Sequence, residues 1–126
     1  MMLKSLYWRV NFFLKNRKSK RLKKRLDGNV SALTVNTKNG TFLVDAADLE
    51  VGAKLRTKGE YGIDEINRIS NYIDKESNVL IVGAHIGSLA IPVAKICSEV
   101  TAIEANPNNF NLFEKNIKLN NISNIV

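Results

Sequence analysis

The sequence predicts an α/β fold organised around a doubly wound parallel sheet. Three features of the second half of the chain predict it: an apolar run at residues 78–82 that stops at Gly83, a second short strand-like run at residues 100–103, and a helix-like segment after each run. Strands that alternate with helices pair in parallel through right-handed crossovers. With 44% hydrophobic and 25% charged residues among 126, the composition is that of a globular protein.

The positive charge of the chain is concentrated at its N-terminus. Residues 1–26 hold ten lysines and arginines and no acid, and the remainder holds nine bases and twelve acids, so the net charge of +7 divides into +10 and −3. Lys4 and Arg9 interrupt the apolar first half of this arm, which is too short to span a membrane. Most charges follow the apolar stretch, unlike those of a secretory signal. The sequence therefore predicts a basic amphipathic arm over residues 1–27.

Three interpretations of this arm remain open. Its apolar side packs on the domain, or it lies on an anionic membrane surface, or it binds nucleic acid. Trp8, Phe12 and Phe13 beside a Lys/Arg block favour a membrane surface over nucleic acid. We therefore expect a cytoplasmic protein, free or peripheral to the membrane through residues 1–26, and the sequence disfavours nucleic acid as a partner.

Residues 28–77 are predicted to form a β-hairpin, a loop and a helix that precede the core. Residues 32–45 contain two short strands around the turn signal Lys38-Asn39-Gly40. Residues 49–62 show no clean period and are predicted as a loop. Four isoleucines spaced three to four residues apart then define one face of a helix that should lie against a sheet: Ile63, Ile66, Ile69 and Ile73.

Residues 78–126 are predicted to be the N-terminal part of the main domain. Residues 78–82 form a strand covered on both faces, and a largely buried helix spans residues 89–97 with Pro92 in its first turn. After the strand at residues 100–103, Asn106 caps a second helix that Pro107 begins. This helix is expected to bury Phe110, Phe113 and Ile117 and to stop at Asn120 and Asn121, before residues 123–126 start a third strand.

The junctions between strand and helix predict a nucleoside site. A helix N-terminus offers free N–H groups, and Gly83 and Gly87 would let a ligand approach the backbone. Glu104, 21 residues after Gly83, would accept hydrogen bonds from both hydroxyls of a ribose. His85 and Ser88 stand where a dinucleotide fingerprint needs glycine, which disfavours NAD. The structural alternative is that the two glycines permit close helix packing and that Glu104 is a solvated strand end.

Two segments carry a family resemblance. "VLIVGAHIGSLAIPVAK" and "VTAIEANPNNFNLFEKNIKLNNISNI" resemble the start of FkbM-type methyltransferases, a branch of the class I S-adenosylmethionine-dependent enzymes, and "VGAKLRTKGEYGIDEI" resembles what precedes their catalytic domain. The resemblance implies a Rossmann-like fold, S-adenosyl-L-methionine as cofactor, and O-methylation of a sugar, glycan or secondary metabolite. It also implies the cofactor contacts: Gly83, Ala84, His85, Ile86 and Gly87 at the methionine part, Glu104 on the ribose, and Ala105 and Asn106 beside it.

The sequence departs from that family pattern at several points. Ile81 stands where an acidic residue is usual, and His85 where asparagine is common. His85 either replaces the amide as a neutral imidazole, repels the sulfonium when charged, or has no catalytic duty. With one cysteine and one histidine, the chain is expected to hold neither a disulfide nor a metal site.

The chain stops as the third strand begins, whereas the class I sheet has seven strands. We therefore expect an incomplete methyltransferase fold that is inactive alone, with no assignable catalytic base. Residues 79–82 would form an open apolar sheet edge that a partner chain could cover. A binding module completed by a partner is the alternative to an enzyme.

Overall fold

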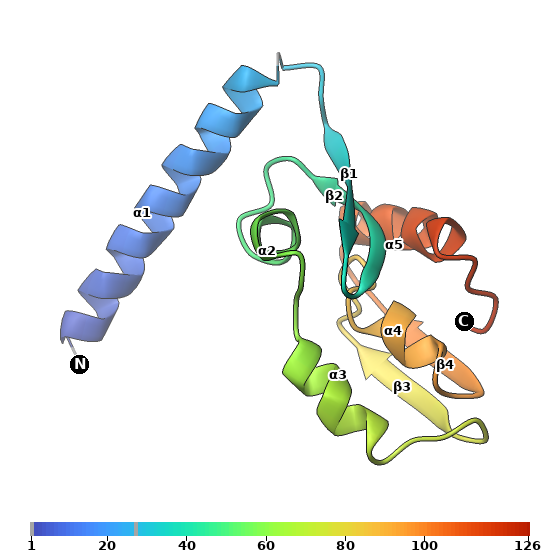
Figure 1. Cartoon of the computed structure of the whole chain (residues 1–126). Coiled ribbons are helices and arrows are strands. Elements are labelled where there is room, and N and C mark those ends of the chain that lie inside the picture. Colours follow the sequence, from blue (N-terminus) through green and yellow to red (C-terminus); the bar gives the residue numbers. More distant parts are fainter. Residues whose placement is uncertain (1, 27) are drawn as a thin grey trace.

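The computed structural model describes residues 2–26 and 28–126. Its elements follow in the order α1 (Met2–Arg25), β1 (Ala32–Thr37), β2 (Gly40–Asp45), α2 (Val51–Lys58), α3 (Ile63–Ser70), β3 (Asn78–Val82), α4 (Ala90–Ala94), β4 (Glu99–Ile103) and α5 (Pro107–Leu119). Figure 1 shows α1 as a long helix that projects from a body formed by the other elements. The predicted α/β organisation, with a basic helix and a hairpin before a parallel pair of strands, is confirmed.

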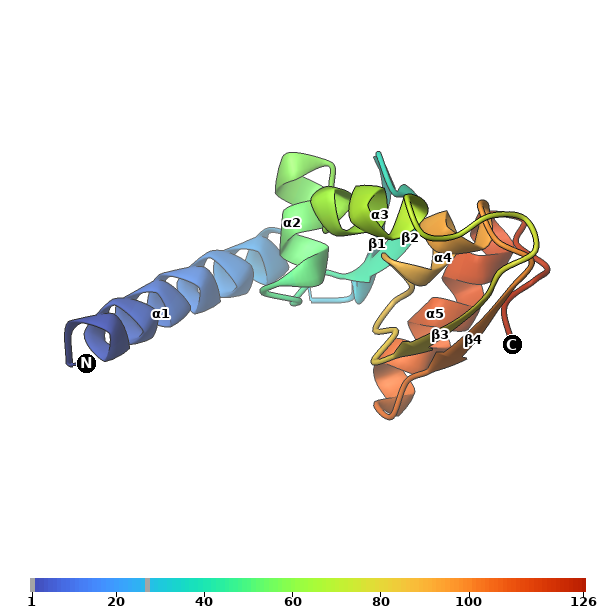
Figure 2. The ribbon, with the colours of Figure 1, turned by 90° about the horizontal axis from the view of Figure 1, so that it is seen from below.

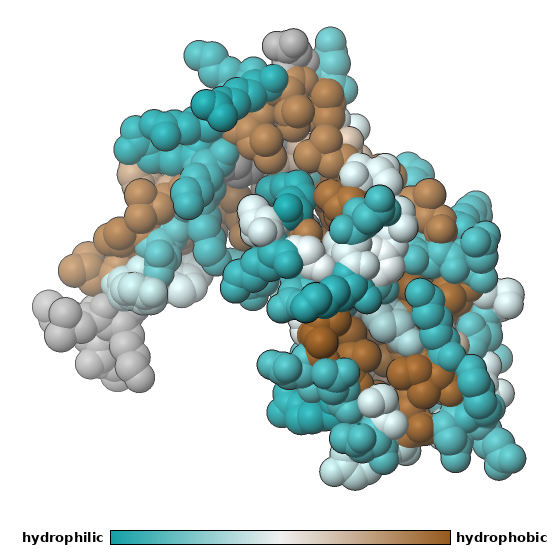
Figure 3. Space-filling model, in the orientation of Figure 1, coloured by the Kyte–Doolittle hydropathy of each residue, from teal (hydrophilic) through white to brown (hydrophobic). Residues whose placement is uncertain are grey.

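The helix α1 separates its apolar and basic residues along its length and not around its circumference. Val10 and Leu14 share one face with Arg17 and Arg21, which lie one and two turns further on. Trp8 is 66% exposed, and Figure 3 shows apolar surface toward the N-terminal end of α1 and hydrophilic surface toward the other end. The expected amphipathic arm is therefore wrong in that respect, because an amphipathic helix needs its apolar residues on one stripe throughout. No helix in the described part of the chain has the length and apolarity needed to cross a membrane.

The hairpin formed by β1 and β2 is confirmed, and it belongs to the core. The strands pair antiparallel from Ala32↔Asp45 to Thr37↔Gly40, so Lys38 and Asn39 make a two-residue turn. Phe42 and Val44 of β2 are fully buried in the same apolar cluster as residues of α2, α4, β4 and α5. The hairpin thus packs directly against elements from the second half of the chain, namely α4, β4 and α5.

Two buried asparagines fasten the hairpin to its neighbours. Asn116 of α5 accepts from the N–H of Leu43 (2.6 Å) and donates to the carbonyls of Leu43 (3.2 Å) and Ile86 (3.0 Å). Asn39 donates to the carbonyls of Tyr61 (2.6 Å) and Ser88 (2.9 Å) and accepts from the N–H of Tyr61 (3.0 Å). Each buried side-chain amide thereby forms hydrogen bonds with backbone N–H and C=O groups that lie outside the sheet and helix ladders.

The predicted loop at residues 49–62 is wrong, because it contains α2. Val51 and Leu55 lie four residues apart and are both buried, which is enough to anchor two turns. Asp48 accepts from the N–H groups of Glu50 (2.7 Å) and Gly52 (3.0 Å) at the N-terminal end. Gly59, with φ of 70°, ends the helix by donating to the carbonyl of Leu55. Eight residues with two buried apolar side chains, Val51 and Leu55, give too short a periodic signal to read from the sequence.

The helix α3 forms where the isoleucine spacing predicts it, but its neighbour differs. Ile66 is buried, and Ile69 and Ile73 are partly buried against the core. The helix packs against α4, as the two views of the ribbon show, and not against the sheet that we expected. It ends at Ser70, so Ile73 reaches the core from the segment that follows it.

The strands β3 and β4 pair in parallel from Asn78↔Glu99 to Val82↔Ile103, as predicted. The expected third strand begins at the far side of β4, where the N–H of Val126 donates to the carbonyl of Val100 (2.8 Å). The expectation that helices cover both faces of β3 is wrong for the described residues, since Leu80 is 64% and Val82 73% exposed while Ile81 is buried. Alternate residues of a strand face opposite sides, and only one side is covered here.

The two helices of the parallel unit differ from prediction in detail. The helix α4 spans five residues and is shorter than the predicted 89–97. In α5, Asn106 caps the N-terminus by accepting from the N–H groups of Asn108 (2.9 Å) and Asn109 (3.4 Å), as predicted. Phe113 is buried, but Phe110 is 43% exposed and its predicted burial is wrong. The inward face of α5 is centred on Phe113 and Asn116, and Phe110 falls at its margin.

Candidate cofactor site

The glycine loop that follows β3 is fixed to the end of the neighbouring strand. The N–H groups of Gly83 and Ala84 donate to the carbonyl of Ile103, at 2.8 and 3.0 Å. Gly83 has φ of 82°, and a Cβ placed on it would meet no atom within 4 Å. Packing therefore does not explain this glycine, and its backbone is open to a ligand.

The second glycine of the loop, Gly87, is required by close packing. Gly87 has φ of 88°, and a Cβ there would lie 2.5 Å from the ring of Phe113 and 3.1 Å from Cδ1 of Ile91. Close packing on α5 thus accounts for Gly87. Ala84 and Ile86, both predicted to lie beside the cofactor, are buried in the core at 3% and 1% exposure. Ala84 lines the hollow described below, whereas the carbonyl of Ile86 accepts from Asn116.

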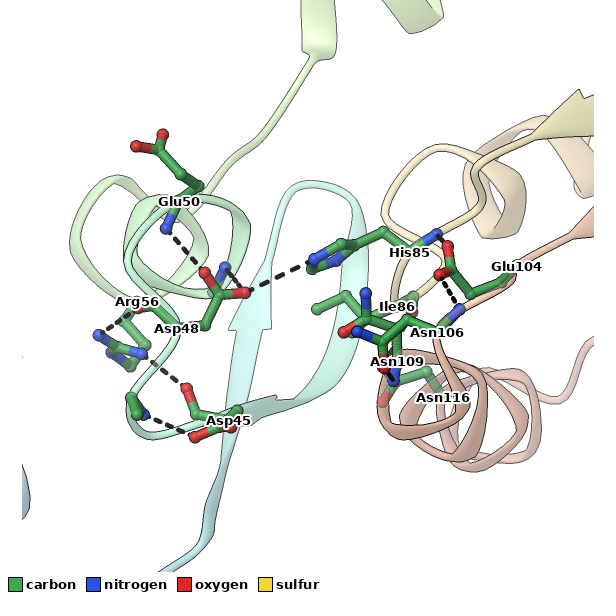
Figure 4. Close-up of polar contacts among 12 residues, drawn as sticks. Asp45, Asp48, Glu50, Arg56, His85, Ile86, Glu104, Asn106, Asn109 and Asn116 are labelled. Carbon is green, nitrogen blue, oxygen red and sulfur yellow. Dashed lines mark hydrogen bonds and ion pairs between the residues drawn. The ribbon is translucent and has the colours of Figure 1, made fainter.

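Glu104 lies where the carboxyl ends of β3 and β4 meet, and Figure 4 shows its carboxylate between two backbone donors. Oε2 accepts from the N–H of His85 (2.7 Å), and Oε1 accepts from the N–H of Asn106 (2.8 Å). These bonds, first the one from Asn106 and then the one from His85, hold the pKa of Glu104 below its ordinary value of 4.5 against the opposing effect of burial. The carboxylate is therefore ionised and fixed in place. Ala105 is exposed, and the side chain of Asn106 caps α5 by accepting from the N–H groups of Asn108 and Asn109.

His85 occupies a strained position in the loop. Its φ is 52°, in the left-handed region that few residues with a Cβ adopt. Figure 4 shows its ring turned toward Asp48, with 4.0 Å between Nε2 and Oδ2. Its Nδ1 is buried and has no hydrogen-bond partner. His85 thus links the glycine loop to the N-terminal end of α2.

A hollow of about 300 Å³ opens beside the loop. Its lining combines the loop with the segment before and within α3: Val51, Tyr61, Gly62, Glu65, Gly83, Ala84, His85, Ser88 and Leu89. Tyr61, Gly62 and Glu65 were not predicted as site residues, because the first two lie in a segment predicted as a loop and Glu65 lies on the polar face of α3. The one signal for them in the sequence is the pair of glycines, Gly59 and Gly62. In the structure both adopt a positive φ.

The residues of this site fit S-adenosylmethionine. An open glycine backbone at Gly83 leaves room for the methionyl part beside a hollow that carries the Glu65 carboxylate. Each ionised carboxylate oxygen of Glu104 has a second lone pair besides the one that a backbone N–H uses, so it can accept from a ribose hydroxyl. Ile81, at the usual acidic position, packs into the core and offers no polar contact.

Comparison with known proteins identifies relatives of this arrangement. The sequence model of the TRM5/TYW2 methyltransferase domain matches residues 34–126. Among solved structures, TYW2 of M. jannaschii in complex with AdoMet is 27% identical, with a TM-score of 0.63 over 79% of this chain and 43% of that one. The M. jannaschii tRNA m1G37 methyltransferase is 25% identical, with a TM-score of 0.60 over 78% of this chain and 29% of that one.

A third relative is a complex of aTrm5 with tRNALeu, 25% identical, with a TM-score of 0.60 over 78% of this chain and 27% of that one. The chain therefore spans less than half the length of each of these solved relatives. No curated protein matches the sequence.

These findings correct two expectations. The resemblance to FkbM-type enzymes is wrong, since the matching family is TRM5/TYW2; a glycine loop followed by an acidic strand end serves the cofactor and does not distinguish acceptors. We expected a small molecule or glycan as substrate and disfavoured nucleic acid as a partner. The complex of the relative aTrm5 with tRNALeu overturns this expectation. The Rossmann-like methyltransferase fold and S-adenosylmethionine are confirmed at the level of the family. The chain belongs to the TRM5/TYW2 methyltransferase domain family.

Proposed function

We propose that this chain forms the S-adenosylmethionine-binding part of a methyltransferase that acts on tRNA. The observation that carries the proposal is the Glu104 carboxylate, held beside the glycine loop by two backbone N–H groups, within the residues that match the family. The tRNA substrate follows the relatives, of which one is a tRNA methyltransferase and another is bound to tRNA.

The chain's own residues would divide the cofactor between them. Glu104 would accept hydrogen bonds from the ribose hydroxyls, and the exposed backbone at Gly83 would admit the methionyl part. Glu65, the acidic residue that lines the hollow, would face the positive charge of the amino group. When bound, S-adenosylmethionine supplies an electrophilic methyl group on a sulfonium, and holding it in line with an acceptor lowers the barrier to transfer.

Two binding measurements on the 126-residue chain test the proposal. Calorimetric titration with S-adenosylhomocysteine checks the cofactor site, and fluorescence anisotropy with a labelled, unmodified tRNA transcript checks the substrate class. We expect both ligands to bind. A folded chain that binds S-adenosylhomocysteine but no tRNA at low salt would contradict the substrate, and one that binds no S-adenosylhomocysteine would contradict the cofactor site.

A further inference from the structure

Three hollows on the surface lie next to one another, because neighbouring hollows share lining residues. The first, of about 500 Å³, lies between α1 and α2, and Lys54 and Lys58 line both it and the second hollow of about 560 Å³. Tyr61, Gly62 and Glu65 line both the second hollow and the third, the one at the glycine loop. We call the three adjacent hollows together the connected groove. It runs from the basic arm to the candidate cofactor site.

The first part of the connected groove is strongly basic. Its charged lining residues are Lys15, Lys18, Asp48, Lys54, Arg56 and Lys58. Lys15 is paired with Glu50 (2.6 Å between Nζ and Oε1), and Arg56 donates to the carbonyls of Asp45 and Asp48. In the described part of the chain, Lys18, Lys54 and Lys58 form no salt bridge. The three ammonium groups can therefore pair with the phosphates of a polyanion, although Lys54 also contacts the ring of Tyr61.

An aromatic ring stands where the basic part ends. Lys54 Nζ lies 5.1 Å from the centre of the Tyr61 ring. Asn39 holds the Tyr61 backbone through both its N–H and its carbonyl, so this residue is anchored to the hairpin turn. Aromatic rings on a rigid backbone serve as stacking platforms for unpaired bases, and phosphates beside them need cations.

We propose that the connected groove is the path of a single-stranded segment of RNA. Lys18, Lys54 and Lys58 contact its phosphates, a base stacks at Tyr61, and the chain of nucleotides leads to the hollow at Gly83. The inference rests on the proposed function and adds to it a surface that includes α1, which lies outside the family match at residues 34–126. The exposed aromatic residues of α1, which are Tyr7, Trp8, Phe12 and Phe13, do not line the groove, but the apolar residues Leu22, Leu49 and Ala53 do, so the test below includes lipid vesicles as well as RNA.

The test compares two triple variants of the full chain with equal loss of charge. The groove variant is Lys18→Gln/Lys54→Gln/Lys58→Gln, and the control is Lys95→Gln/Lys115→Gln/Lys118→Gln, at exposed positions away from the groove. The probes are a labelled tRNA transcript and a labelled single-stranded RNA, each titrated over a range of salt concentrations. Calorimetry with S-adenosylhomocysteine and circular dichroism report the cofactor site and the fold of every variant.

We expect the groove variant to lose about tenfold or more in RNA affinity and to lower the salt slope by about 2, as three lost phosphate contacts require. The control should lose about twofold or less, and S-adenosylhomocysteine binding should stay unchanged in both. Tyr61→Leu should weaken RNA binding by about tenfold, whereas Tyr61→Phe, which keeps the ring, should not.

Other outcomes would overturn the inference. Equal losses in the two triple variants would mean general attraction without a path. If the groove variant bound RNA like the wild type but lost binding to phosphatidylserine vesicles, the groove would be a membrane surface. If the wild type bound RNA and the groove variant did too, only the path would fail, whereas absence of RNA binding by the wild type would remove the tRNA assignment itself.

Discussion

The backbone N–H of His85 donates a 2.7 Å hydrogen bond to Oε2 of Glu104, which joins the glycine loop after β3 to the end of β4. These residues lie 19 positions apart in the chain. The bond fixes the carboxylate that we assign to the ribose before any ligand arrives, and it uses one lone pair of that oxygen. Preorganisation of this kind lowers the cost of ordering the site on binding.

The lowered pKa of Glu104 predicts a dependence of stability on pH. A carboxyl group whose pKa is depressed by folding contributes stability above its ordinary value of 4.5, and this contribution is lost as pH falls through the folded-state pKa. Glu104→Gln should therefore flatten the loss of stability below about pH 4.5. Urea unfolding of the wild type and the variant at pH 3.5, 5 and 7 measures this dependence of the unfolding free energy on pH. Glu114→Gln, on the exposed surface of α5, is the control, and an identical pH profile in both variants would contradict the account.

The two glycines of the loop should respond differently to alanine. Gly87→Ala places a Cβ against Phe113 at a positive φ, so it should cost about 3 kcal/mol of unfolding free energy from overpacking and backbone strain. Gly83→Ala adds only strain, about 1 kcal/mol, but should weaken S-adenosylhomocysteine binding. Urea unfolding and calorimetry on both variants check this. A large loss of stability in Gly83→Ala with none in Gly87→Ala would reverse our assignment.

The buried amide of Asn116 should be important for stability. Asn116→Leu leaves the N–H and carbonyl of Leu43 and the carbonyl of Ile86 without their partner, which should cost about 3 kcal/mol or more. Asn108→Ala, at an exposed position of the same helix, should change stability by less than about 0.5 kcal/mol. Urea unfolding of the two variants decides the matter, and equal values would show that the hairpin is held by apolar packing alone.

The carboxylate of Glu65 should contribute modestly to cofactor affinity. Because Glu65 is exposed, Glu65→Gln should weaken S-adenosylhomocysteine binding by only about fivefold. Asp64→Asn is the matched control, since Asp64 precedes it in α3 and lines the second hollow but not the third. Calorimetry at low and high salt measures both affinities. If Asp64→Asn had the larger effect, Glu65 would have no direct contact with the cofactor.

The sequence predicted those elements whose signals are local. The strand β3 follows from its apolar run, and the start of α5 follows from the adjacent Asn106 and Pro107. The helix α2 was missed because two buried apolar side chains in eight residues give too little periodicity. The long-range hydrogen bonds of Asn116 and of the turn residue Asn39 were not predicted, because these partners lie 73 and 49 positions away in the chain and a sequence pattern does not show such pairings.

The candidate site was predicted in part for the same reason. The glycine loop and Glu104 stand at strand ends that the alternating pattern locates, so their proximity could be expected. Tyr61 and Glu65 reach the hollow only because α2 and α3 fold back beside the loop, as Figures 1 and 2 show. The family was misassigned because the residues that hold a cofactor resemble one another across groups whose acceptors differ.

Calorimetric titration of the 126-residue chain with S-adenosylhomocysteine, beside Glu104→Ala, tests the central claim most directly. We predict micromolar binding by the wild type and a loss of about tenfold or more in the variant, because hydrogen bonds to a charged carboxylate are removed. Circular dichroism and Glu114→Ala control for folding and for the loss of one charge. A folded wild-type chain that binds no S-adenosylhomocysteine, or a Glu104→Ala variant that binds it equally well, would contradict the account.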